Sequence, residues 1–233
     1  MKYAWQIAWR EIRWEIFGDR GAIFRMAIFA ALPVAFVLTN RSPRIGEIGI
    51  FALALQSVLF PALSGVALIS STFTQEKENG TIIPLLASPV RDVDIVVGKL
   101  VGMIIPVFSL CIASLAVYYV LAGSQYGETR VAAALPPAIL YSLVVVALLY
   151  LLTAGSWVLI VAALVRTTRA GQQVAGLLIA LSVAVFAGLG AAAAQIGDGY
   201  ALIALGLLLV GSDVVAVQVA RRVWQREEVL ARL

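Results

Sequence analysis

Six runs of apolar residues alternate with short polar segments along the chain. A bilayer crossing needs about 20 apolar residues in a helix, and each run reaches or approaches that length. The pattern therefore predicts an all-α membrane protein with six transmembrane helices. The predicted spans are 22–39, 48–71, 100–122, a segment within 136–165 that Pro136 and Pro137 open, 174–193 and 201–220.

Residues 1–21 precede the first span and carry an amphipathic pattern. Apolar side chains recur at helical spacing on one face, and the charged side chains, Glu11 among them, are expected on the remaining faces. The pattern predicts an interfacial helix that lies on the membrane surface. Its apolar face comprises Trp5, Ala8, Trp9, Ile12 and Ile16.

The longest polar-studded segment, residues 73–99, separates the second and third predicted spans. Charges and an Asn-Gly pair within Gln75–Gly80 predict that the preceding helix ends there. Thr81 is suited to cap a short helix over Ile82–Ala87, and Ser88-Pro89 closes it because a residue before proline avoids the α conformation. The product is a short helix with apolar side chains exposed at the membrane surface, where it needs a partner.

Composition agrees with a membrane protein and excludes several other classes. Of the 233 residues 62% are hydrophobic and 13% charged, and the mean hydropathy is +0.98. The net charge of +4 comes from basic residues beside the spans, without interleaved base-stacking aromatics, so we expect no nucleic-acid partner. The chain has no histidine, and Cys111 is its single cysteine, which excludes an intrachain disulfide.

Basic residues predict the orientation. With six spans, one side of the membrane receives only three of the 17 Lys and Arg residues, namely Arg41, Arg44 and Arg130. Because cytoplasmic loops are enriched in Lys and Arg, both termini and the 73–99 loop are predicted to be cytoplasmic. The expected organisation is an interfacial helix over 1–21, a six-helix domain over 22–220 and a cytoplasmic tail over 221–233.

The chain carries no recognisable ATPase or hydrolase motif. A Walker A loop needs G-x-x-x-x-G-K-S/T, whereas Gly98-Lys99 precedes Leu100 and lacks the upstream glycine. We expect no catalytic residues and no metal ligands. Gly98 and Gly102 form a G-x-x-x-G spacing that favours close helix packing.

Two polar side chains within predicted spans are candidates for a translocation path. Asp213 in the sixth span either faces a cavity as a path or proton-linked residue, or makes a structural hydrogen bond with Ser212 or another helix. Gln56 in the second span either lines a pathway or bonds to another helix or subunit. In the fifth span, the Gly- and Ala-rich residues 186–194 either complete a simple crossing or re-enter from the outer face.

The central loop resembles a known family. The run Gln75–Thr81, followed by Leu85-Leu86, Ser88-Pro89 and Gly98-Lys99, is similar to the E-x-E-x-G-T, leucine-pair, S/T-P and G-K signature of ABC type-two exporter permeases. Ile82 and Ile83 stand where that family often has an acidic residue. The amphipathic start, the six spans and the basic turn before the fifth span extend the resemblance over nearly the whole chain.

The resemblance implies a permease subunit without its own ATPase site. Two permease copies, expected here as a homodimer in a prokaryotic (inner) membrane, would sit on two cytoplasmic P-loop ATPase subunits that bind ATP and magnesium. No cofactor is expected in this chain. The 73–99 loop would be the coupling helix that receives the ATPase, and the motif positions are Glu76, Glu78, Gly80, Thr81, Leu85, Leu86, Ser88 and Pro89.

Other functions stay open on sequence alone. One is a haem-exporter-like B subunit of cytochrome c maturation, although this chain has no histidine to ligate haem. A second is an ion-coupled secondary transporter that uses Asp213, and a third is a membrane scaffold that anchors a cytoplasmic protein through the same loop. The substrate is not encoded in any motif, and the sparsely polar spans favour amphipathic cargo only slightly.

Overall fold

The computed structural model describes residues 2–16, 20–39, 45–78, 91–165 and 168–223. Within these ranges the chain is helical and contains no strand, which confirms the all-α prediction. Its elements are α1 (Lys2–Arg10), the π-helical turn η1 (Glu11–Ile16), α2 (Arg20–Thr39), α3 (Glu47–Glu78), α5 (Asp92–Tyr126), α6 (Glu128–Ala134), α7 (Pro137–Leu164), α8 (Thr168–Ile196) and α9 (Asp198–Val223).

Five of these helices contain segments long and apolar enough to cross a membrane. The segments are Glu47–Ala67, Val97–Tyr126, Pro137–Val161, Arg169–Phe186 and Gly199–Val219. In α2 the uninterrupted apolar stretch, Met26–Thr39, is shorter, because Arg20 and Arg25 occupy the beginning of the helix. The helices therefore support a multi-pass membrane protein, and the sixth span stays a prediction for α2.

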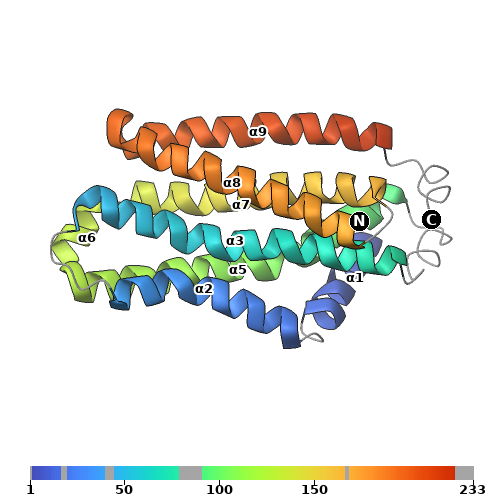
Figure 1. Ribbon diagram of the computed structural model, residues 1–233, viewed down its shortest axis with the longest axis horizontal. Coiled ribbons are helices and arrows are strands. Elements are labelled where there is room, and N and C mark those ends of the chain that lie inside the picture. Colours follow the sequence, from blue (N-terminus) through green and yellow to red (C-terminus); the bar gives the residue numbers. More distant parts are fainter. Residues whose placement is uncertain (1, 17–19, 40–44, 79–90, 166–167, 224–233) are drawn as a thin grey trace.

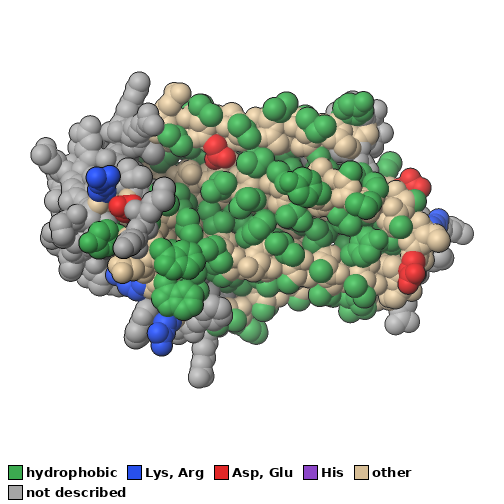
Figure 2. Space-filling view, turned by 180° about the vertical axis from the view of Figure 1, so that it is seen from behind, with side chains coloured by type: hydrophobic (Ala, Val, Ile, Leu, Met, Phe, Trp, Pro, Cys, Tyr) green, Lys and Arg blue, Asp and Glu red, His purple; other side chains and the backbone are tan. Residues whose placement is uncertain are grey.

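The long helices run side by side and give the molecule two distinct ends. α1, the last turns of α3, the first turns of α5 and the last turns of α9 gather at one end, whereas α6 and the turn between α8 and α9 lie at the other (Figure 1). Between the ends, hydrophobic side chains cover the lateral surface, and most of the coloured charged side chains lie near the two ends (Figure 2). This distribution fits a bundle that crosses an apolar layer.

The bundle is organised around α3, which contacts α2, α5, α7 and α8. Small residues let its neighbours approach, and Ala54 and Ala62 are fully buried. The buried hydroxyl of Ser57 donates to the Ala54 carbonyl at 2.7 Å, and Tyr118 of α5 donates to the Ile50 carbonyl of α3 at 2.7 Å. Polar groups inside the bundle are thus paired with backbone acceptors, as an apolar environment requires.

Two predicted irregular segments are more helical than the sequence suggested. The expected outer loop 123–130 is nearly all helix, since α5 continues to Tyr126 and α6 begins at Glu128. Only Gly127, at a φ of 96°, interrupts the two helices. Likewise α8 passes without a break through residues 186–194, so the re-entrant alternative is not observed. Alanine has the highest helix propensity and no proline interrupts this run, which explains the continuous helix.

Candidate functional site at the junction of α1 and α5

The N-terminal helix packs against the beginning of α5 and does not lie free on a surface. Ile7 and Ala8 are 8% and 0% exposed at this contact, whereas Trp5 and Trp9 remain more than half exposed. The predicted apolar face is therefore only partly correct: Ala8 packs inward, and the two tryptophans lie on the outside. Exposed tryptophans beside a membrane span are suited to the lipid interface.

Glycines on α5 permit this contact. A Cβ atom at Gly98 would lie 2.7 Å from the Ala4 carbonyl oxygen, and one at Gly102 would lie 2.8 Å from the Ala8 carbonyl oxygen. Neither distance is compatible with a side chain unless α1 moves away. The close packing predicted from the Gly98 and Gly102 spacing is confirmed, and its partner is the N-terminal helix.

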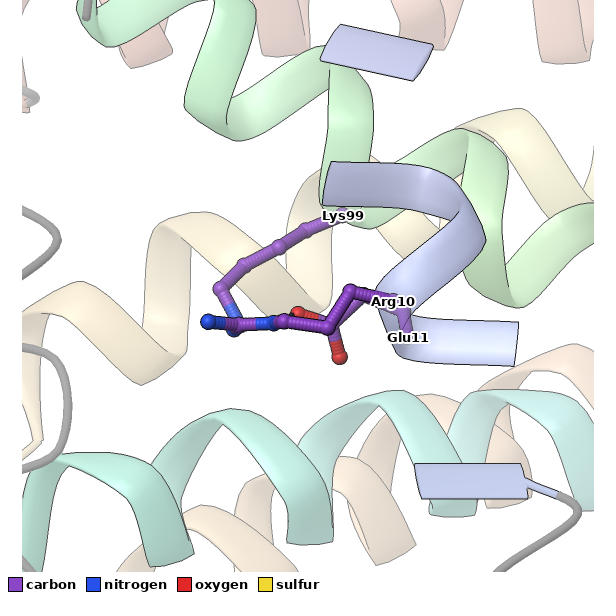
Figure 3. A network of polar contacts seen from close by, with 3 residues as sticks. All are labelled: Arg10, Glu11 and Lys99. Atoms are coloured by element: carbon purple, nitrogen blue, oxygen red, sulfur yellow. Dashed lines mark hydrogen bonds and ion pairs between the residues drawn. The ribbon is translucent and has the colours of Figure 1, made fainter. Parts of the chain in front are cut away.

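A buried ion pair lies directly beside these glycines. The Lys99 Nζ atom donates to Glu11 Oε1 at 3.0 Å, and the two side chains are 1% and 0% exposed. Arg10, half exposed at its side chain, donates to the same oxygen at 3.1 Å. Figure 3 shows the three side chains converging, with Lys99 reaching from α5 and the other two from the N-terminal segment. The expectation that Glu11 lies with the other charges, away from the packing face of the helix, is wrong.

The loss of either charge would destabilise the contact between α1 and α5. Both charges have left water, a desolvation cost that attraction offsets only while the partners stay in place. Within the described part of the chain the second carboxylate oxygen, Glu11 Oε2, is buried and has no hydrogen-bond partner. Attraction to Lys99 therefore carries much of the compensation for burying this carboxylate.

Backbone geometry explains why Glu11 points inward. Ala4 and Ala8 are four positions apart, as are Ile7 and Glu11, and Glu11 follows Ala8 by three, which places the four residues along one face of a helix. At Glu11 the helix changes to π-helical hydrogen bonding over Glu11–Ile16, and such turns often occur at functional sites. The sequence does contain a signal for this contact: small residues at Ala4 and Ala8 match the spacing of Gly98 and Gly102.

The predicted coupling residues precede Gly98 and Lys99 in the sequence. Glu76 and Glu78 belong to the last turn of α3, whose backbone the structure describes. Gly80, Thr81, Leu85, Leu86, Ser88 and Pro89 lie outside the described residues. α5 begins at Asp92, so Gly98 and Lys99, at the end of the 73–99 segment, lie in its first turns. The α1 contact therefore follows the motif residues 76–89 closely in sequence.

The two path candidates lie on different helices. Gln56 is exposed on α3, although its neighbours Leu55 and Ser57 are buried. Asp213 is partly buried on α9, which packs mainly on α7 and α8, and it lies close to Thr153 of α7, whose hydroxyl donates to the Leu149 carbonyl at 2.9 Å. Ser212 is occupied elsewhere, because its hydroxyl oxygen accepts a hydrogen bond from Trp157 Nε1 at 2.9 Å.

The fold and the junction together define a polytopic helical membrane protein in which the N-terminal helix packs against the first turns of a spanning helix, α5. Comparison with family models identifies the family: the model described as ABC-2 family transporter protein matches residues 45–209. The chain belongs to this family. The matched region contains Gln56, the 73–99 loop and Lys99, and it excludes Glu11 and Asp213. No curated protein shows significant similarity to the chain.

Proposed function

We propose that this chain is the membrane-spanning permease subunit of an ABC exporter and that a separate ATPase docks on its 73–99 loop. Family membership supports a permease subunit of an ABC transporter. The absence of a Walker A motif from the sequence supports a separate source of ATP hydrolysis. In this arrangement ATP and magnesium bind to the partner, and this chain contributes no catalytic residue.

The observation that carries the coupling mechanism is the buried Glu11–Lys99 pair. It joins the N-terminal helix to the first turns of α5, at the end of the 73–99 segment. At this contact Gly98 and Gly102 leave no free space. Packed elements move as rigid bodies, so a displacement of the loop passes to α1 and α5 together. Lys99 and Glu11 are positioning residues in this mechanism, because they hold two helices and touch no substrate.

A homodimer in a prokaryotic (inner) membrane completes the proposed transporter. Gln56 exposes a polar amide on α3, the helix that is otherwise the most buried in the bundle. An amide in contact with lipid lacks hydrogen-bond partners, and a second copy placed over this position would supply them. The gathering of α1 and the end of α9 at one end of the bundle (Figure 1) supports a topology with both termini on the same, cytoplasmic side and with α2 as the sixth span.

The coupling role is tested by reconstituting the permease with a P-loop ATPase that copurifies with it. We expect Gly80→Pro and Leu85→Asp to reduce permease-dependent, vanadate-sensitive ATP hydrolysis to the rate of the ATPase alone, while membrane insertion is unchanged. Leu207→Ala, a change on the exposed face of α9, is the control and should retain coupling. Full stimulation by both loop variants would contradict the docking assignment.

One observation favours a second candidate. A half-buried acidic side chain within a membrane span, as at Asp213, is typical of proton-linked and ion-linked transport. An ion-coupled transporter would need no ATPase and would be inactivated by Asp213→Asn. An ABC permease would keep ATPase stimulation in that variant, so the same reconstitution separates the two functions.

A further inference from the structure

A cavity of about 410 Å³ lies between α7, α8 and α9. This volume falls within the range of about 300–1,000 Å³ that is usual for small-molecule sites. Residues from all three helices form its wall, and apolar side chains dominate. They are Tyr150, Thr153, Ala154 and Trp157 of α7, Leu178, Leu181, Ser182, Val185 and Phe186 of α8, and Leu205, Leu208, Leu209 and Ser212 of α9.

The cavity is a groove that opens on the lateral surface of the bundle. Leu181 and Leu208, on facing walls, are 63% and 58% exposed. α8 and α9 meet at the turn of Gly197, and from there Figure 1 shows α8 crossing towards α3, which it also contacts, while α9 stays along α7. The two helices therefore diverge towards the end of the bundle that holds α1.

The back wall of the groove is fixed by hydrogen bonds. Tyr150 donates to the Ser182 hydroxyl at 3.0 Å, and its ring meets Phe186 edge to face at a centroid distance of 5.3 Å. Trp157 donates to Ser212 at 2.9 Å. These contacts occupy the neutral polar groups and hold the wall in place without a ligand, so the groove is preformed.

Asp213 places an acidic side chain next to the groove, directly after Ser212, which lines it. Leu205 and Leu209 line the cavity, and Asp213 continues their row at the next spacing of four, on the same face of α9. Asp213 lies close to Thr153, which also lines the cavity. Asp213 is partly exposed, and it stands beside a groove whose wall is mostly apolar.

We propose that this groove binds an amphiphile with a primary amine head group, whose alkyl chain occupies the space between α8 and α9 and whose ammonium group pairs with Asp213. The complementarity is direct: the walls match a hydrocarbon chain, and the carboxylate matches a cation at the end where a head group would emerge. A bilayer lipid with an amine head and a free single-chain amine share this chemistry. The site does not depend on the proposed ATP-driven transport.

Binding is measured on the full chain in phosphatidylcholine nanodiscs, without an ATPase. A variant with Trp5, Trp9, Trp14 and Trp224 replaced by Phe keeps Trp157, in the groove wall, as its sole fluorophore. We expect dodecylamine to change the Trp157 fluorescence in a saturable way. Dodecanol has the same chain, and its hydroxyl can donate to Asp213 but carries no positive charge to pair with the carboxylate, so it should bind about tenfold more weakly.

Variants separate the head-group contact from the groove. Asp213→Asn should weaken dodecylamine about tenfold and leave dodecanol nearly unchanged. Leu208→Trp and, on the facing wall, Leu181→Trp should block both compounds by filling the groove. For each variant, the emission without ligand is subtracted from the emission with ligand, which removes the constant contribution of the added tryptophan. Leu207→Trp, on the neighbouring position of α9 that is 70% exposed and does not line the cavity, should bind like the parent.

The results also identify the source of the ligand. Nanodiscs containing phosphatidylethanolamine should raise the apparent Kd of dodecylamine if a bilayer lipid occupies the groove, and leave it unchanged if the site prefers the free amine. Equal binding of amine and alcohol, or an unaltered Asp213→Asn variant, would overturn the assignment of the head group. Unaltered binding in both groove-filling variants would overturn the site.

Discussion

At the scale of single residues, the junction depends on a charge pair that is removed from water. Lys99 and Glu11 are separated by 88 positions in the chain and meet at 3.0 Å. A buried pair of this kind is weak evidence for stability, since a well-packed apolar pair can replace it, but the loss of one partner is costly. Its value here is specificity, because only one register of α1 on α5 brings the two charges together.

Lys99→Met should lower the stability of the folded protein by about 3–5 kcal/mol, because Glu11 is then left buried without its principal cation. The double variant Glu11→Leu/Lys99→Met should recover most of this loss. Denaturant titration in mild detergent, followed by tryptophan fluorescence, measures both effects.

Arg10→Met is the matched control for Lys99→Met. Arg10 binds the same carboxylate oxygen, but its side chain is half exposed, so the loss should stay below about 1 kcal/mol. If Lys99→Met were no more destabilising than Arg10→Met, Lys99 would not be the compensating cation for Glu11.

At the scale of elements, helix contacts follow the size of side chains as well as their hydrophobicity. The amphipathic pattern correctly predicts a helix in the N-terminal segment, yet it assigns the packing face to the largest apolar residues. In the structure Ala4 and Ala8 approach Gly98 and Gly102, and Trp5 and Trp9 remain outside. Two helix backbones can approach this closely only where side chains are absent or small.

Gly102→Leu should displace α1 from α5, because even a Cβ atom at this position would lie 2.8 Å from the Ala8 carbonyl oxygen. The reporter is Ala8→Cys, a fully buried position, in a background where Cys111 is replaced by serine. Maleimide should label this cysteine slowly in the parent and at least about tenfold faster with Gly102→Leu, since reaction requires opening of the contact.

The control is Gly206→Leu on α9, where an added Cβ atom would meet no atom within 4 Å. It should leave the labelling of Ala8→Cys at the parent rate. Slow labelling in the Gly102→Leu variant as well would show that α1 does not require this glycine.

At the scale of the whole molecule, the least buried helices and the exposed polar side chain of α3 indicate where lipid or a second subunit must lie. The spanning segments of α8 and α9 have most of their positions open to the outside, and α3 is mostly enclosed. Gln56 is therefore exceptional, because a polar side chain is exposed on the central helix.

Gln56→Cys should cross-link two copies in native membranes if the proposed homodimer covers this position. A twofold interface brings one residue of each subunit close to its own counterpart when that residue lies near the axis. With Cys111 replaced by serine, a short bifunctional thiol reagent should give a dimer on denaturing gels. Leu207→Cys, equally accessible on α9, should stay monomeric, and the opposite pattern would place the interface elsewhere.

The predicted topology is tested with cysteines at Ser42 and Ser88, in the two loops that six spans would place on opposite sides. An impermeant maleimide applied to intact cells should label Ser42→Cys, and Ser88→Cys should react only after the membrane is opened. Labelling of both cysteines from the same side would exclude a single crossing by α3 between them, and with it the predicted six-span topology.

Much of the architecture follows from the sequence because the bilayer imposes it. Long apolar runs must become helices, since every backbone amide and carbonyl needs a partner in hydrocarbon. The helices α3, α5, α7, α8 and α9 contain the runs that predict them, whereas α6 lies outside these runs. The family resemblance rested on local motifs, and the family match confirms it. These features depend on neighbours in the sequence or on the surrounding solvent.

The tertiary structure alone decided which residues meet across the chain. Glu11 and Lys99 each look like surface charges in their own segments, and only the close contact at Gly98 and Gly102 buries them together. The position of Asp213 next to a groove is likewise decided by packing, because α7 and α8 form that groove together with α9. Hydrophobic periodicity records how strongly each segment avoids water, but it carries no information on which distant surface will cover it. That is settled when the helices pack.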